Sequence, residues 1–165
     1  MPIGAGPVVA VVRGMTTATK KILVATDFSE ASDEALIRAI ELGRQMGAML
    51  EIVHVLEFGD SAQPPFGLIN YVGDVGGLIA HVERELAARS NEVVAAGLRS
   101  FARTLEGSAY QEIVREAREA NVDLIVIGTH GRRGLARAMV GSVAERVVRH
   151  ASCPVLTVPF SKKAA

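Results

Sequence analysis

Five short, mostly apolar runs separated by longer segments of helical periodicity constrain the fold of this chain most. The runs are Ile22–Thr26, Leu50–Leu56, Ser100–Leu105, Val122–Ile127 and Val155–Val158. Apolar runs of this length are typical of strands that are covered on both faces. No hairpin turn signal separates them, so helical crossovers must connect them, and the strands must run parallel. The sequence therefore predicts an α/β fold with a three-layer, doubly wound, five-stranded parallel sheet.

Helix signals lie between these strands. Ser29 suits a helix N-cap and Gly47 suits the end of the same helix. A long helix is predicted from Leu78 to about Leu98, with Val82, Leu86, Val93 and Val94 on one side. The pairs Ser108 with Gln111 and Ser142 with Glu145 have the spacing of capping boxes, so each predicts a helix start.

The chain reads as one domain with less regular ends. We expect residues 20–160 to form that domain, residues 1–19 to form a flexible extension, and residues 161–165 to form a tail. The segment Glu57–Gly77 is rich in Gly, Pro, Asp and Ser and is too long for an ordinary connection. We therefore predict a linker or a lid there.

Composition excludes several classes of function. Eighteen basic residues balance eighteen acidic ones, so no overall field attracts nucleic acid or an anionic membrane. No apolar run approaches the roughly 20 residues of a membrane span, and the N-terminus lacks the features of a secretion signal. We expect a cytoplasmic protein. The single cysteine, Cys153, reads as inert packing, because it has no intramolecular partner and no metal-binding pattern around it.

The segment after the fourth strand carries the strongest functional signal. Gly128 and Gly131 follow the strand, and Gly141 and Ser142 come nine residues later at a helix start. Glycines let backbone amides approach a ligand closely, and the N-terminus of a helix favours an anion. Phosphate is the natural occupant of such a loop. The simpler alternative is that the glycines only make a tight turn between strand and helix.

Two other features of the residues refine this hypothesis. Asp27 follows the first strand, which the reversal of winding would place beside the fourth strand, where ligands bind in such sheets. The chain has no Walker lysine motif, and no glycine follows the first strand, so NAD binding is disfavoured. His54 lies within a strand and is expected to make a satisfied hydrogen bond, whereas His130 lies in the glycine loop.

These segments resemble the universal stress protein family, over roughly Lys20 to Val158. "KKILVATDFSEAS" resembles the family's first strand and its aspartate, and "LEIVHVLE" resembles its second strand. "DLIVIGTHGRRGLARAMVGSVAERVVRHASCPVLTV" resembles its C-terminal signature. The residues Gly128, Gly131, Gly141 and Ser142 meet the pattern G-x2-G-x9-G-[S/T] of the ATP-binding subclass. The resemblance implies the strand order 3-2-1-4-5 of the adenine nucleotide alpha hydrolase-like fold.

The resemblance also implies roles for individual residues. The triphosphate would be held by Gly128, Gly131, Gly141 and Ser142, with the amides of His130 and Val143 beside it. Asp27 would contact the ribose or the magnesium of bound Mg-ATP. Ala25 and Thr26 would line the adenine side, and Val55 would recognise adenine through its backbone. The family further implies a homodimer in which Val155–Val158 pairs across the interface.

The function expected from these observations is regulatory. The first hypothesis is a stress-response protein that binds ATP with Mg²⁺ and whose nucleotide occupancy is read by protein partners. The second is a slow Mg-dependent ATPase, for which the sequence offers no nucleophile with an obvious base. The third is a dimeric interaction module that binds no nucleotide.

Overall fold

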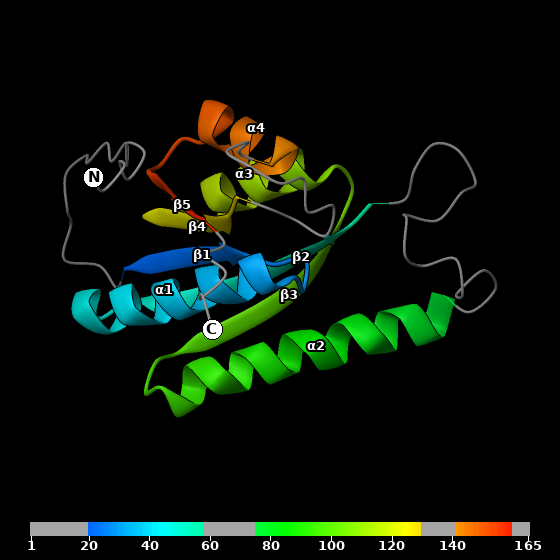
Figure 1. Cartoon of the computed structure of the whole chain (residues 1–165), viewed down its shortest axis with the longest axis horizontal. Coiled ribbons are helices and arrows are strands. Elements are labelled where there is room, and N and C mark those ends of the chain that lie inside the picture. The colour runs from blue at the N-terminus through cyan, green and yellow to red at the C-terminus, as the bar shows by residue number, and fades with distance from the viewer. Residues whose placement is uncertain (1–19, 58–74, 130–140, 160–165) are drawn as a thin grey trace, which may run out of the picture.

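The computed structural model describes residues 20–57, 75–129 and 141–159. The strands are β1 (Lys21–Ala25), β2 (Met49–Leu56), β3 (Ser100–Glu106), β4 (Leu124–Gly128) and β5 (Val155–Val158). The helices are α1 (Glu30–Met46), α2 (Val75–Ala95), α3 (Ala109–Glu119) and α4 (Ser142–His150). Strands and helices alternate along the described chain, as Figure 1 shows.

The strands form one sheet in the order β3-β2-β1-β4-β5, and every neighbouring pair is parallel. The predicted fold class and the implied strand order are therefore confirmed. β1 lies at the centre, so the chain winds toward one edge through β2 and β3 and toward the other through β4 and β5. The reversal of winding falls between β1 and β4, whose carboxyl ends lie side by side.

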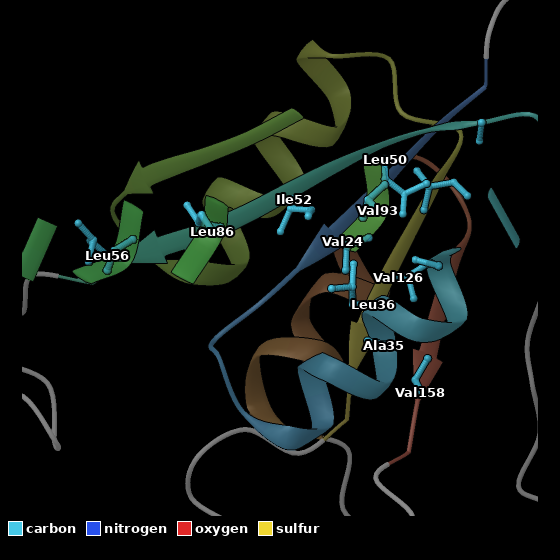
Figure 2. Close-up of a cluster of buried hydrophobic side chains, with 14 of the residues drawn as sticks. Val24, Ala35, Leu36, Leu50, Ile52, Leu56, Leu86, Val93, Val126 and Val158 are labelled. Carbon is cyan, nitrogen blue, oxygen red and sulfur yellow. The ribbon is translucent and has the colours of Figure 1, made fainter. Parts of the chain in front are cut away.

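Helices cover both faces of the sheet, and alternate residues of each strand supply the two cores. Ile22 and Val24 of β1 face α1 and α2, in the cluster shown in Figure 2. Leu23 and Ala25 face the opposite way and belong to the cluster beneath α3 and α4. Ile22, Leu23 and Val24 each contribute about 1.5–3 kcal/mol through full burial. The aliphatic core thus fixes which side of each strand meets which helices.

Several predicted boundaries shift by a few residues. β4 begins at Leu124 rather than Val122, because the Val122 N–H donates to the carbonyl of Ala117 and completes the end of α3. α2 begins at Val75, so the last residues of the predicted linker are helical, and it ends at Ala95. Val94 was placed on the same side of this helix as Val82, Leu86 and Val93, and this is wrong, because those three are buried and Val94 is 57% exposed. It follows the fully buried Val93, and consecutive helical residues point about 100° apart.

The helix ends confirm some of the capping predictions and correct others. Ser29 is the N-cap of α1 and accepts from the Ser32 N–H, and Gly47 ends that helix in the left-handed conformation. Ser108 is the N-cap of α3, but its side chain makes no capping hydrogen bond. The capping box predicted at Ser142 is wrong, because Gly141 occupies the N-cap position and makes Ser142 the first helical residue.

Candidate functional site

The candidate site lies at the carboxyl ends of β1 and β4. Ala25 is in register with Ile127, so Thr26 and Asp27 leave the sheet beside Gly128. Figure 1 shows that α1 follows β1 at this edge and that α4 begins at the same edge. The fold therefore brings together two segments that are about 100 residues apart in the sequence and that were both predicted to bind a ligand.

Thr26 is held by hydrogen bonds on both its backbone and its side chain. It is buried, and its N–H donates to the Val53 carbonyl at 2.9 Å. Its hydroxyl lies 3.0 Å from the hydroxyl of Ser32 and accepts from the Phe28 N–H at 3.0 Å. The Ser32 hydroxyl in turn donates to the Ser29 carbonyl. These bonds hold the Thr26 side chain in the turn after β1 and stabilise that turn.

Asp27 stands in that turn, at the N-terminus of α1. Its Oδ1 accepts from the Ser29 N–H at 3.1 Å and from the Ser29 hydroxyl. Ser29 is also the N-cap of α1, so one serine both caps the helix and orients the carboxylate. Asp27 is half-buried, and it follows β1 at the edge where ligands bind in such sheets.

Gly128 ends β4 where the strand approaches the first turn of α1. A Cβ placed on it would stand 2.7 Å from the carbonyl oxygen of Ala31 and 2.8 Å from its carbonyl carbon. Real Cβ atoms do not approach backbone this closely, so only glycine fits without displacing α1. Gly128 therefore has a packing reason to be glycine that the loop pattern did not reveal.

Gly141 closes the loop that begins at Gly128. Its N–H donates to the carbonyl of Thr129, and the Thr129 N–H donates to the Val158 carbonyl at 2.9 Å. The two ends of the glycine pattern are thereby joined next to the end of β4. Gly141 has φ −56°, which any residue adopts, so no unusual backbone conformation explains this glycine.

α4 begins directly after Gly141. Ser142 is exposed and is the first residue of α4, after the N-cap Gly141. The first N–H groups of a helix have no partner within the helix and carry its positive dipole end. Val143 is half-buried and packs on the core beneath α3 and α4. The N-terminus of α4 thus adds hydrogen-bond donors beside the joined loop ends.

Two of the predicted adenine-side residues, Ala25 and Val55, share one face of the sheet, whereas the Thr26 hydroxyl bonds to Ser32 of α1 on the other face. Ala25 is buried in the core beneath α3 and α4, and Val55 packs against the same core. Val55 lies near the end of β2, two residues beyond Val53, the register partner of Ala25. The structure thus brings Ala25 and Val55 to neighbouring strand ends on the same side of the sheet as Val143.

Two predicted site residues, His130 and Gly131, lie outside the described residues. So do residues 1–19, most of the predicted linker, the predicted tail (161–165), and Arg132, Arg133 and Arg137 between the glycines. Within residues 20–57, 75–129 and 141–159, no group of three His, Cys, Asp or Glu side chains is placed to hold a metal ion. No helix among those residues is long and apolar enough to cross a membrane.

Sequence reasoning missed Phe28 as a residue of this site. Phe28 has φ 62°, and its ring stacks on the imidazole of His54 with centroids 4.3 Å apart. The prediction that His54 makes a hydrogen bond is confirmed, because its Nδ1 lies 2.9 Å from the Thr26 carbonyl oxygen. A phenylalanine directly after the aspartate was the only available signal, and it does not reveal a left-handed backbone.

Comparisons with known proteins agree with this architecture. A model of the universal stress protein family matches residues 18–159. Universal stress protein MJ0531 of Methanocaldococcus jannaschii is 33% identical over 159 residues, which cover 93% of this chain and 90% of that protein. The solved structure of MJ0577, a universal stress protein of the same organism, has a TM-score of 0.72 at 26% identity and covers 87% of this chain and 98% of that one.

A further solved structure bears on the ligand of a relative. It is a universal stress protein in complex with cAMP, with a TM-score of 0.64 and 26% identity over 88% of this chain and all of that one. The family model spans most of the chain, and MJ0531 shares a third of its aligned residues over nearly the whole length. The chain therefore belongs to the universal stress protein family.

Proposed function

We propose that this protein binds an adenine nucleotide, and specifically ATP, at the carboxyl ends of β1 and β4. One observation carries the proposal: the hydrogen bond from Gly141 to Thr129 joins both ends of the glycine pattern beside the N-terminus of α4. Backbone amides and a helix N-terminus in one place form an anion site. The cAMP complex of a relative supports an adenine nucleotide as the source of that anion.

The residues of the proposed site fall into three groups, which would contact the phosphates, the ribose and the adenine. The phosphates would lie against the backbone of Gly128, Gly141, Ser142 and Val143, together with His130 and Gly131. Asp27 would accept a hydrogen bond from a ribose hydroxyl. The adenine would lie near Ala25, Thr26 and Val55, where the backbone of a strand end supplies hydrogen-bonding groups and the side chains supply apolar contact.

Magnesium would come with the phosphates. Asp27 is the carboxylate in the turn directly after β1, and one of its oxygens already accepts two hydrogen bonds from Ser29. One carboxylate with phosphate oxygens and waters is an ordinary magnesium environment. Bound Mg²⁺ would neutralise phosphate charge, while Asp27 would orient the nucleotide from the ribose side.

The proposed role is regulatory rather than catalytic. Nucleotide occupancy would set the shape of a surface that protein partners read in the cytoplasm. We also propose a homodimer in which β5, an edge strand of the sheet, pairs with its copy in a second chain. An edge strand offers an unpaired row of backbone groups, which is the usual template for such pairing.

A charge substitution at the start of α4 tests the proposed site. Ser142→Asp places a negative charge where the phosphates would bind, yet a carboxylate in the first turn favours the helix. We expect titration with a fluorescent ATP analogue to show binding that weakens by about 10-fold or more, with unchanged thermal stability.

The matched control is Ser152→Asp, which adds the same charge to an exposed serine beyond the other end of α4. It should bind as the wild type does. Absence of saturable binding to the wild type, or equal affinity in the wild type and both variants, would overturn the proposed site.

A further inference from the structure

The residue after Asp27 is fixed by contacts that reach a distant helix. The ring of Phe28 stacks on His54 of β2, with centroids 4.3 Å apart and planes inclined by 20°. The guanidinium of Arg89 in α2 lies over the same ring, 4.8 Å from its centroid. Phe28 thus contacts both the end of β2 and the middle of α2.

The backbone of Phe28 needs these contacts. Its φ of 62° is in the left-handed region, which residues other than glycine rarely adopt. Its N–H donates to the Thr26 hydroxyl at 3.0 Å, which closes the turn that presents Asp27. Because the conformation is unfavourable in isolation, the ring contacts and this hydrogen bond must hold it in the folded protein.

His54 holds the turn at a second point. Its Nδ1 lies 2.9 Å from the carbonyl oxygen of Thr26, while its ring stacks on Phe28. One imidazole therefore contacts the residues on either side of Asp27. A change in the position of the Phe28 ring would move the turn at both points, and Asp27 with it.

Arg89 connects this turn to the body of α2. Its side chain is only 11% exposed, and it donates to Asp33 of α1 at 2.8 and 3.0 Å. It also donates to Glu85 of its own helix at 3.0 Å. The buried cation is therefore paired and held in place, and its location over the Phe28 ring is a fixed feature of how α2 docks.

We propose that Phe28 is a positioning residue for the nucleotide site and that, through Arg89, it couples nucleotide binding to the docking of α2. The inference rests on the proposed function, since it connects the proposed nucleotide site to α2 through Phe28 and Arg89. Coupling of this kind is reciprocal: nucleotide that favours the present turn also favours docked α2, and docked α2 strengthens nucleotide binding.

The test compares Phe28→Leu with Phe28→Tyr. Leucine removes the stacking and cation contacts, whereas tyrosine keeps the ring. We expect Phe28→Leu to weaken binding of the fluorescent ATP analogue by about 3- to 10-fold, and Phe28→Tyr to stay within about 2-fold of the wild type. Arg89→Met removes the cation from α2 and changes no residue of the turn itself, and it should weaken binding by a similar factor.

Hydrogen exchange distinguishes coupling from a purely structural role of Phe28, because a structural role would not make the exchange of α2 amides depend on ATP. Saturating ATP should slow amide exchange around Arg89 in the wild type and in Phe28→Tyr, but not in Phe28→Leu or Arg89→Met. If the wild type binds no nucleotide, the proposed function fails. If the wild type binds but both Phe28→Leu and Arg89→Met keep its affinity and its protection of α2, this inference fails and the proposed function stands. Should Phe28→Leu not fold, Arg89→Met decides.

Discussion

Gly128 lies so close to Ala31 that a Cβ on the glycine would stand 2.7 Å from the alanine carbonyl oxygen. This contact sets the distance between the end of β4 and the first turn of α1. Both segments border the candidate nucleotide site. The same contact therefore helps to set the distance between Asp27, just before α1, and Gly128, the first glycine of the pattern. The first glycine of the pattern is therefore a requirement of the fold, whatever it contacts in a ligand.

Gly128→Ala should destabilise the protein. The added methyl meets backbone atoms that cannot rotate away, and overpacking of this kind costs about 1–3 kcal/mol. Urea unfolding followed by far-UV circular dichroism measures the change. Ala31→Gly in the same chain should not restore stability, because the carbonyl of residue 31 remains in place. Restoration would show that the Ala31 methyl, 3.2 Å from the added Cβ, is the true obstacle.

Ser29→Ala should lower both stability and nucleotide affinity. It removes the side-chain acceptor of the Ser32 N–H and the hydroxyl donor to Asp27. Loss of an N-cap costs about 0.5–2 kcal/mol. Ser29→Thr keeps a hydroxyl in the same place and is the matched control in urea unfolding and ATP-analogue titrations. Unchanged affinity in Ser29→Ala would show that Asp27 does not depend on this serine.

Glu51 should make stability depend on pH. It lies in β2 with its side chain only 5% exposed, near Arg103 and Glu116, in a pocket at the amino ends of the strands and away from the candidate site. Burial raises the pKa of Glu51 above its ordinary value of 4.5, and Glu116 raises it further. Arg103 and Lys21 oppose that rise.

The sign follows from the direction of the shift. A raised pKa means that the folded state binds the proton more tightly than the unfolded state, so stability is lost as pH rises above the ordinary value. As pH rises above 4.5, the free energy of unfolding of the wild type should therefore fall relative to that of Glu51→Gln, by at most about 1.4 kcal/mol per pH unit.

Urea unfolding at a series of pH values that rises from 4.5 measures this difference. Glu119→Gln, at an exposed carboxylate on α3, is the control and should show no such trend relative to the wild type. A pH-independent difference between the wild type and Glu51→Gln would contradict the prediction.

Cys153 should react slowly with thiol reagents in the folded protein. Burial raises the pKa of its thiol above 9.0, and the charge of Asp123 adds to that rise. Because the thiolate is the nucleophile, alkylation by iodoacetamide at neutral pH should be at least about 10-fold slower in the native protein than in urea. Equal rates in the two conditions would show that the fold neither shields the Cys153 thiol nor raises its pKa. The sequence-based interpretation of Cys153 as inert packing makes the same prediction.

Much of the architecture could be predicted because it depends on local patterns. Apolar runs between helical segments define parallel strands, and the short connections leave few ways to arrange them. The N-cap at Ser29 and the left-handed end at Gly47 follow from the chemistry of single residues. The predicted cap at Ser142 was wrong. The residue that occupies the N-cap of α4 depends on where the chain returns to the sheet. The hydrogen bond from the Gly141 N–H to the Thr129 carbonyl fixes that position, and it joins residues too far apart in the sequence for a capping pattern to show.

The sequence by itself determined the order of elements, the family, and the residues that follow β1 and β4. Only the tertiary structure decided that Gly128 is required by α1, that Phe28 takes a left-handed backbone, and that Arg89 reaches it from α2. The physical reason is range. Helices, strands and caps are set by neighbours a few residues away, whereas Gly128 meets Ala31, and Phe28 meets His54 and Arg89, only after the sheet and its helices have packed.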